Sequence, residues 1–262
     1  GIRCAEPIAH CTDPALIGRP FLLQAFIAGI AQARKVVRDP GVAAFGPALA
    51  AELGAELARI HTIRPPWPEL SFLPIPLLPP ARAEVARVRR LLDGATEPRP
   101  AMEYILAWLD ANAPPAPPVL SLAHGDYRTG NYLMSEGRLA GVLDWEFAHW
   151  GDGREDLGWF CARCWRFGGA LPAGGIAPRA ALLEGYNRIA QRRVGEAELA
   201  YWEILAAAKW GTLAVLQGDR FRKGGEASIE LALTGLMAPE MELDALDGIA
   251  HLRALRSGKG GR

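Results

Sequence analysis

The most regular pattern in the chain is a helical one. From Val42 to Ile60, apolar side chains recur every three or four residues, at Leu49, Leu53 and Leu57. This spacing predicts an amphipathic helix that buries one face and ends near His61. Similar patterns predict seven further helices, over residues 82–92, 102–111, 155–165, 179–192, 196–217, 226–237 and 243–255. Most of the chain is therefore expected to be helical.

The expected strands lie at the beginning and in the middle of the chain. Residues 19–27 form an apolar run that predicts a buried strand, and a shorter strand is expected around residues 2–9. Two more short strands, at 131–134 and 138–143, flank an expected turn at Glu136-Gly137. The second pair would place a hairpin at the centre of the sequence.

Proline divides the chain between these elements. Residues 65–80 contain seven prolines, which preclude a regular helix and predict an extended excursion, either a surface loop or a substrate lid. A second proline cluster at 114–118 is expected to be a spacer. The Gly- and Arg-rich end, residues 257–262, is expected to be a flexible tail.

Composition limits the kinds of partner. The 262 residues are 50% hydrophobic and 22% charged, and 29 basic residues balance 29 acidic ones. A net charge of zero gives no overall attraction to nucleic acid or to an anionic membrane, so neither partner is expected. The sequence contains no apolar run of membrane-spanning length and does not open with a signal-peptide pattern, so a cytoplasmic location is expected. The four cysteines are too few for a disulfide scaffold and are expected to be buried thiols, with a zinc site as the alternative.

Two segments carry the candidate chemistry. His124-Gly125-Asp126-Tyr127-Arg128-Thr129-Gly130-Asn131 is followed, after the expected hairpin, by Leu143-Asp144-Trp145-Glu146. Phosphoryl transfer from Mg-ATP to a hydroxyl needs a carboxylate that orients the acceptor, together with an Asn and a second Asp that hold metal ions. Asp126, Asn131 and Asp144 offer these groups in that order. Motifs typical of dinucleotide-binding, Walker-type, serine-hydrolase and zinc-protease sites are absent from the sequence.

These segments resemble those of the aminoglycoside phosphotransferase/choline kinase family, which has a protein-kinase-like fold. The run 19–29 resembles that family's hinge strand, Leu57-Ala58-Arg59-Ile60-His61 its early C-lobe helix, and 151–157 the segment after its metal-binding Asp. The resemblance implies an α+β fold with a mostly helical C-lobe and a short β-hairpin at the active site. It implies an N-lobe remnant with the hinge over 1–28, a C-lobe over 29–256 and a tail over 257–262.

The resemblance also implies a role for individual residues. Asp126 would be the catalytic carboxylate, and Asn131 and Asp144 would hold Mg²⁺. The hinge backbone at Gln24, Ala25 and Phe26 would bind the adenine of ATP. Four further residues would contact the substrate or support the site, namely His124, Arg128, Glu146 and Asp156. The chain would then be an ATP- and Mg²⁺-dependent kinase for a hydroxyl of a small molecule.

The front of the chain departs from the family pattern. The phosphate-covering loop, the lysine that clamps the phosphates and the acidic partner of that lysine are not found, because the hinge arrives within the first thirty residues. The expectation is therefore an N-terminally truncated kinase whose isolated chain has little activity. The alternative is a non-catalytic, kinase-like module that binds a ligand or a protein.

Substrate choice stays open at the level of sequence. Six carboxylates are expected near the site and would suit a cationic acceptor, although metal binding and structural support account for at least three; they are Asp126, Asp144, Glu146, Asp152, Glu155 and Asp156. The tryptophans at 145, 150, 159 and 165 are expected to form either a cation-binding cage or part of the core. The sequence does not indicate an oligomeric state.

Overall fold

The structure is a computed structural model that describes residues 1–117 and 119–257. Nine α-helices lie within those residues. They are α1 (Ala33–Val37), α2 (Val42–Ile60), α3 (Pro80–Leu92), α4 (Pro100–Ala111), α5 (Arg154–Cys161), α6 (Arg179–Ile189), α7 (Glu196–Arg222), α8 (Ile229–Gly235) and α9 (Ala238–Arg256). Two short 3₁₀ helices are η1 (Pro68–Leu70) and η2 (Arg163–Trp165). The helices expected from periodicity are present, and their bounds differ from expectation by several residues at some ends.

Six strands form three antiparallel pairs in the described residues. They are β1 (Pro7–Cys11) with β2 (Phe21–Gln24), β3 (Ser121–Ala123) with β6 (His149–Gly151), and β4 (Tyr132–Ser135) with β5 (Arg138–Val142). Glu136 and Gly137 both have positive φ, 52° and 73°, as a two-residue turn between twisted strands requires. The turn expected from the sequence therefore lies between β4 and β5.

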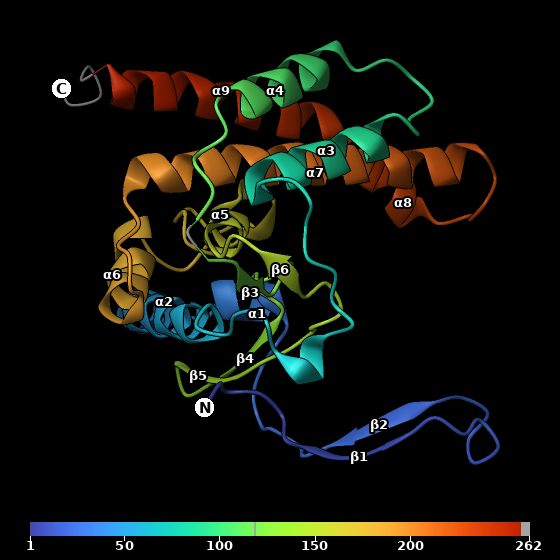
Figure 1. The fold of residues 1–262 in the computed structure, drawn as a ribbon, viewed down its shortest axis with the longest axis vertical. Coiled ribbons are helices and arrows are strands. Elements are labelled where there is room, and N and C mark those ends of the chain that lie inside the picture. The colour runs from blue at the N-terminus through green and yellow to red at the C-terminus, as the bar shows by residue number, and fades with distance from the viewer. Residues whose placement is uncertain (118, 258–262) are drawn as a thin grey trace.

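Helix α7 is the centre of the helical part (Figure 1). It packs against α5 on one side and against α3, α4, α8 and α9 on the others. Two apolar clusters fill the interior. One joins α2, α6 and the hairpin β4–β5, and the other joins α3, α4, α7 and α9. The segment between β3 and α5 contributes Tyr127, Tyr132 and Trp150 to the first cluster, which anchors the candidate site in the core.

The contact between α2 and α6 depends on two glycines. A Cβ at Gly54 would lie 2.1 Å from the Leu182 carbonyl oxygen, and one at Gly185 would lie 1.8 Å from the Ala51 oxygen. Real Cβ atoms do not approach backbone this closely, so glycine is required for the two helices to meet at this distance. This contact places the end of α2, which carries His61, next to the candidate site.

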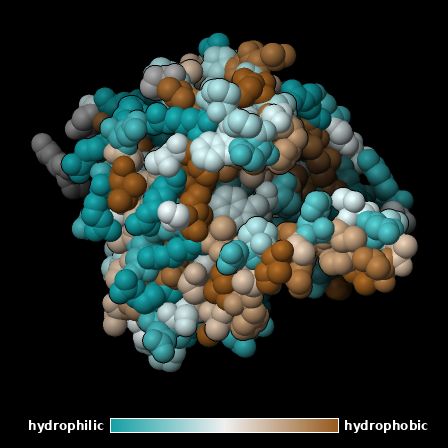
Figure 2. Space-filling model, turned by 60° about the horizontal axis from the view of Figure 1, so that its bottom comes forward, coloured by the Kyte–Doolittle hydropathy of each residue, from teal (hydrophilic) through white to brown (hydrophobic). Residues whose placement is uncertain are grey.

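The expectation of a buried strand at 19–27 is wrong. Only four of these residues form β2, and Leu22, Leu23 and Phe26 are 55%, 52% and 93% exposed. An apolar run predicts burial, but β2 pairs only with β1, and the pair projects from the rest of the described chain (Figure 1). Figure 2 shows hydrophobic side chains among polar ones on the face that includes this hairpin.

The cysteines also differ in part from expectation. Cys161 is buried and burial raises the pKa of its thiol, whereas Cys4 is exposed and Cys11 and Cys164 are half-buried. All four are free thiols, and they form no shared metal-ligand cluster in the described part of the chain. The expectation of buried thiols therefore holds for Cys161 alone, and the alternative, a zinc site built from the four cysteines, is not formed in the described residues.

The two proline-rich segments lack α-helix where the structure describes them, except that Pro80 begins α3. Residues 65–79 are loop apart from η1, and residues 114–117 have no regular secondary structure. Residue 118 of the expected spacer and residues 258–262 of the expected tail lie outside the described residues. No helix within 1–117 and 119–257 is both long enough and apolar enough to cross a membrane.

We expect Gly185→Ala to lower the free energy of unfolding by about 1–3 kcal/mol, because the added methyl overpacks the α2–α6 contact. Urea unfolding followed by circular dichroism measures this. Gly225→Ala is the matched control, since its Cβ would meet only the Arg220 oxygen at 3.5 Å. Equal stability of the two variants would contradict the role assigned to the glycine contact.

Candidate active site

The loop from His124 to Asn131 connects β3 to β4 and carries the first candidate group. Gly125 has a φ of +81°, and a Cβ there would lie 2.3 Å from the Phe147 oxygen. Only glycine fits this position without strain. The tight turn brings the side chain of Asp126 to a cleft bounded by α3, α5 and α7.

Asp126 is held by three donors although it lies at the cleft. Its Oδ1 accepts a hydrogen bond of 2.7 Å from the indole N–H of Trp159, and its Oδ2 accepts one of 2.6 Å from Asn131 Nδ2. Arg128 Nε lies 3.2 and 3.1 Å from the two carboxylate oxygens. Only 8% of the residue is exposed. The carboxylate is therefore fixed in orientation before any ligand arrives.

Asp156, on α5, fixes the backbone of this loop from behind. It is fully buried, and it accepts hydrogen bonds from the backbone N–H groups of His124 at 2.7 Å and Gly125 at 2.8 Å. The third donor is His61 Nε2, at 3.0 Å. Burial alone would raise the pKa of Asp156, but these hydrogen bonds and the neighbouring imidazoles lower it below its usual value. The carboxylate is thus ionised and supports the loop rather than a substrate.

The His124 side chain ties the same loop to the segment before Asp144. Its Nδ1 accepts the Asp126 backbone N–H at 3.3 Å, and its Nε2 lies 2.9 Å from the Leu143 carbonyl oxygen. A carbonyl can only accept, so the Nε2 group is the donor of this hydrogen bond. The ring is completely buried. This arrangement assigns His124 a structural position.

Asn131 and Asp144 lie at the two ends of the hairpin β4–β5. The Leu143 backbone N–H donates to the Asn131 carbonyl oxygen at 2.9 Å, so Asp144 follows directly on a residue bonded to Asn131. Asp144 has a φ of +66°, a conformation uncommon outside glycine that often marks functional sites. Its side chain and that of Glu146 are exposed, and neither makes an ion pair within the described residues.

The expected adenine-binding residues lie apart from this group. Gln24 ends β2, and Ala25 and Phe26 follow it. The Ala25 backbone N–H already donates to the Glu6 carbonyl oxygen at 2.9 Å. In the part of the chain that the structure describes, no hydrogen bond or ion pair joins these three residues to Asp126, Asn131 or Asp144.

Three residues hold the site although the sequence predicted no contact of theirs with the loop, His61, Trp159 and Lys209. Trp159 was expected only as part of a cation-binding cage or of the core. Lys209 Nζ lies 3.3 Å from the Gly125 carbonyl oxygen and 4.7 Å from the centre of the Trp159 ring. His61 ends a segment that resembles the family's early C-lobe helix, and Trp159 lies in a predicted helix. Neither pattern indicates which helical positions face the loop. Lys209 lies 84 positions beyond Gly125, so only the folded chain brings them together.

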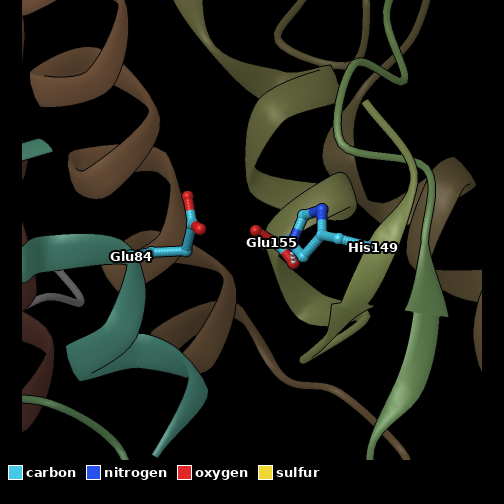
Figure 3. A group of neighbouring side chains, drawn as sticks. All are labelled: Glu84, His149 and Glu155. Carbon is cyan, nitrogen blue, oxygen red and sulfur yellow. Dashed lines mark ion pairs between the residues drawn. The ribbon is translucent and has the colours of Figure 1, made fainter. Parts of the chain in front are cut away.

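A second group of titratable side chains lies beside Lys209. Glu84 of α3 points toward His149 of β6 and Glu155 of α5, as Figure 3 shows. His149 Nε2 lies 2.9 Å from Glu155 Oε1. The charge of Glu155 raises the pKa of His149 to about 10 against the opposing effect of burial. Burial would raise the pKa of Glu84, but Arg87 and Lys209 lower it to about 2. The group therefore carries positive and negative charges side by side.

The carboxylates counted in the sequence do not form an open anionic patch. Asp152 pairs with Arg154 in the interior, Asp156 is surrounded by its three donors, and Glu155 faces His149. Three of these six carboxylates are thus neutralised by the chain itself. The expectation that they suit a cationic acceptor is not supported by this geometry.

The chain is similar to known proteins in sequence and in structure. The sequence profile of the phosphotransferase enzyme family matches residues 1–202. A protein of Ralstonia eutropha JMP134 assigned as an aminoglycoside phosphotransferase has a similar structure, with a TM-score of 0.80, 23% identity and coverage of 94% of this chain and 78% of that one. Choline kinase from Cryptosporidium parvum Iowa II gives a TM-score of 0.62 at 12% identity, covering 98% of this chain and 75% of that one. These similarities show a shared fold.

Curated relatives are similar over a shorter stretch. Acyl-CoA dehydrogenase family member 11 from Gallus gallus is 30% identical over 167 residues, which are 60% of this chain and 20% of the relative. The protein of that name from Pongo abelii is 29% identical over 166 residues, with 61% and 21% covered. The chain thus matches about a fifth of the length of these relatives.

We expect the stability difference between the wild type and His149→Gln to shrink by about 1–2 kcal/mol as pH rises from 6.5 to 10. The pKa of His149 is raised on folding, so its contribution is complete below its unfolded pKa of about 6.5 and is lost as pH rises through about 10. Urea unfolding at a series of pH values measures it. His251→Gln, at an exposed position of α9, is the control and should show no such trend. A difference between the wild type and His149→Gln that stays constant with pH would contradict the assigned ion pair.

Proposed function

The chain belongs to the phosphotransferase enzyme family, and from this premise we propose that it transfers the γ-phosphoryl group of ATP to a hydroxyl of a small molecule. The observation that carries the proposal is the setting of Asp126, a carboxylate held by Trp159, Arg128 and Asn131 at the wall of a large cleft. A carboxylate so placed meets the need of phosphoryl transfer for a group that orients the acceptor.

The step assigned to Asp126 is the removal of one proton. The acceptor hydroxyl donates a hydrogen bond to the Asp126 carboxylate, which takes the proton as the acceptor oxygen bonds to the γ-phosphorus. The bond between the γ-phosphorus and the bridging oxygen breaks, and ADP leaves with the electron pair. The three donors on Asp126 hold the carboxylate in the orientation that this transfer requires, which lowers the entropic part of the barrier.

The side chains of Asn131 and Asp144 fit a hard divalent cation. The Nδ2 group of Asn131 donates to Asp126, which leaves its Oδ1 without a bonding partner in the described residues. Asp144 presents an exposed carboxylate that is likewise unpaired there. Carboxamide and carboxylate oxygens are the donors that Mg²⁺ prefers. When bound, Mg²⁺ would neutralise charge on the phosphates, and Asn131 and Asp144 would hold it.

The nucleotide base is assigned to the hinge. The Ala25 N–H is engaged by the Glu6 carbonyl oxygen, so the adenine is assigned to other backbone groups of Gln24, Ala25 and Phe26. The dehydrogenase activity in the name of the Gallus gallus relative is not assigned to this chain, because the match covers 20% of that protein. A non-catalytic binding module stays the alternative, and the next experiments separate the two.

We expect Asp126→Ala to reduce phosphotransfer by at least about 10²-fold, since the acceptor proton then has no base, while the dissociation constant for ADP stays near that of the wild type. Turnover is followed by ADP release and nucleotide binding by calorimetry. Asp247→Ala, an exposed Asp on α9, is the control. Turnover retained in Asp126→Ala would rule out the role of Asp126, and nucleotide binding without turnover in the wild type would favour the binding module.

We expect Asp144→Asn to weaken the binding of Mg²⁺ to the ADP complex by roughly tenfold or more, because the anionic oxygen ligand is lost. Titration with Mn²⁺ followed by electron paramagnetic resonance measures this without turnover. Asp247→Asn should bind the ion like the wild type. An unchanged Mn²⁺ titration in Asp144→Asn would remove Asp144 from the proposed site.

A further inference from the structure

The cleft beside Asp126 has walls of two different kinds. It has a volume of about 990 Å³ and reaches from the catalytic loop to the proline-rich segment. One wall is residues 74–78, in which Leu77 is fully exposed and Ile75 and Leu78 are about half exposed. Residues of α3 and α7 form another part of the lining. An acceptor bound here meets an apolar surface at one side and charged side chains at the other.

Basic side chains outnumber acidic ones along this cleft. The basic lining residues are Arg87, Arg90, Arg128, His149 and Lys209, and the acidic ones are Glu84 and Asp126. Glu84 is already engaged by Arg87, through hydrogen bonds of 2.7 to 3.1 Å, and lies 3.9 Å from Lys209. When Glu155, which lies beside His149, is added to the acidic residues, the basic residues still outnumber the acidic ones. Arg90 is exposed and has no ion-pair partner in the described part of the chain.

The aromatic rings of the cleft are already used by cations of the chain. The Arg128 guanidinium lies 4.5 Å from the centre of the Trp165 ring, and Lys209 Nζ lies 4.7 Å from that of Trp159. A cationic acceptor would compete with these groups for the ring faces and would be repelled by their charge. The tryptophans therefore support two bound cationic side chains instead of forming a cage for an incoming one.

We propose that the acceptor is an anionic hydroxy compound with an apolar segment, whose carboxylate or phosphate faces Arg90 and Lys209 and whose apolar part lies on residues 74–78. This inference rests on the proposed function, because it identifies the substrate class of the same cleft. The hydroxyl lies at Asp126. The basic side chains and the apolar wall are both needed to hold a ligand of this class.

The first test measures binding alone, by calorimetry with this chain, so that it does not depend on turnover. The probes share a ten-carbon chain with a terminal hydroxyl: 10-hydroxydecanoate, 10-hydroxydecyl phosphate, 1-decanol and 10-amino-1-decanol. We expect the two anions to bind at least about tenfold more tightly than the cationic and neutral probes, and to bind less tightly as salt is raised. The comparison of carboxylate with phosphate then identifies the preferred anion. Gluconate, an anion without an apolar segment, should bind weakly.

Variants at exposed positions test the two walls. Arg90→Gln should weaken binding of 10-hydroxydecanoate by about fivefold and leave 1-decanol unchanged, whereas Arg82→Gln on the same helix is the control, since Arg82 does not line the cleft. Leu77→Ser should weaken both probes, with Leu236→Ser, exposed on the surface after α8, as its control. Both target side chains are exposed, so the variants are expected to fold.

The experiments distinguish failure of this inference from failure of the proposed function. Tighter binding of the amine or the neutral alcohol, or no binding of either anion at millimolar concentration, would overturn the inference. Failure of the proposed function is recognised independently, as anion binding in this cleft with no phosphotransfer from Mg-ATP to the bound hydroxyl. Equal losses in Arg90→Gln and Arg82→Gln would also overturn the placement of the anionic group.

Discussion

The buried carboxylate of Asp156 is the interaction on which the candidate site depends. It joins three separate parts of the chain, because it lies on α5 and accepts hydrogen bonds from His61 at the end of α2 and from the backbone of His124 and Gly125. Burying a carboxylate costs several kcal/mol unless such donors compensate. The folded loop supplies them, so loss of the loop conformation would leave an uncompensated buried charge. The position of Asp126 is therefore coupled to the stability of the whole helical part.

Besides the side-chain hydrogen bonds to Asp126, the backbone of the neighbouring residues also positions the candidate groups. His124 receives the Asp126 N–H and donates to the Leu143 oxygen, and the Leu143 N–H donates to the Asn131 oxygen. These hydrogen bonds thus fix the backbone at Asp126 and Asn131 and at Leu143, which precedes Asp144. The Asp144 carboxylate has no ion-pair partner in the described residues, whereas the Asp126 carboxylate accepts hydrogen bonds from Trp159, Asn131 and Arg128. Unpaired carboxylate oxygens of the Asp144 kind are what the proposed binding of Mg²⁺ requires.

Local patterns predicted local structure well. The periodicity over Val42–Ile60 matched α2, and the loop motif brought Asp126 and Asn131 together as expected. What depends on distant packing was not predictable. The apolar run of β2 indicates a strand but not what covers it, and the partners Trp159 and Lys209 reach the loop only because α5 and α7 pack together. A period of 3.6 residues says that a helix has an apolar face, but not which neighbour that face meets.

The number of carboxylates in the sequence suggested an anionic site, but in the structure basic residues outnumber acidic ones along the cleft. Asp152 pairs with Arg154, Glu155 with His149 and Asp156 with His61, so the charge of these carboxylates is compensated before a ligand arrives. Three of the five basic residues that line the cleft, Arg87, Arg90 and Lys209, come from α3 and α7, far away in sequence. The Arg128 guanidinium and the Lys209 ammonium group lie over the indole rings of Trp165 and Trp159. These cation–π contacts fix the positions of the two charged groups. An acceptor is therefore met by cations already held in place, and less of the free energy of its binding is spent on ordering them.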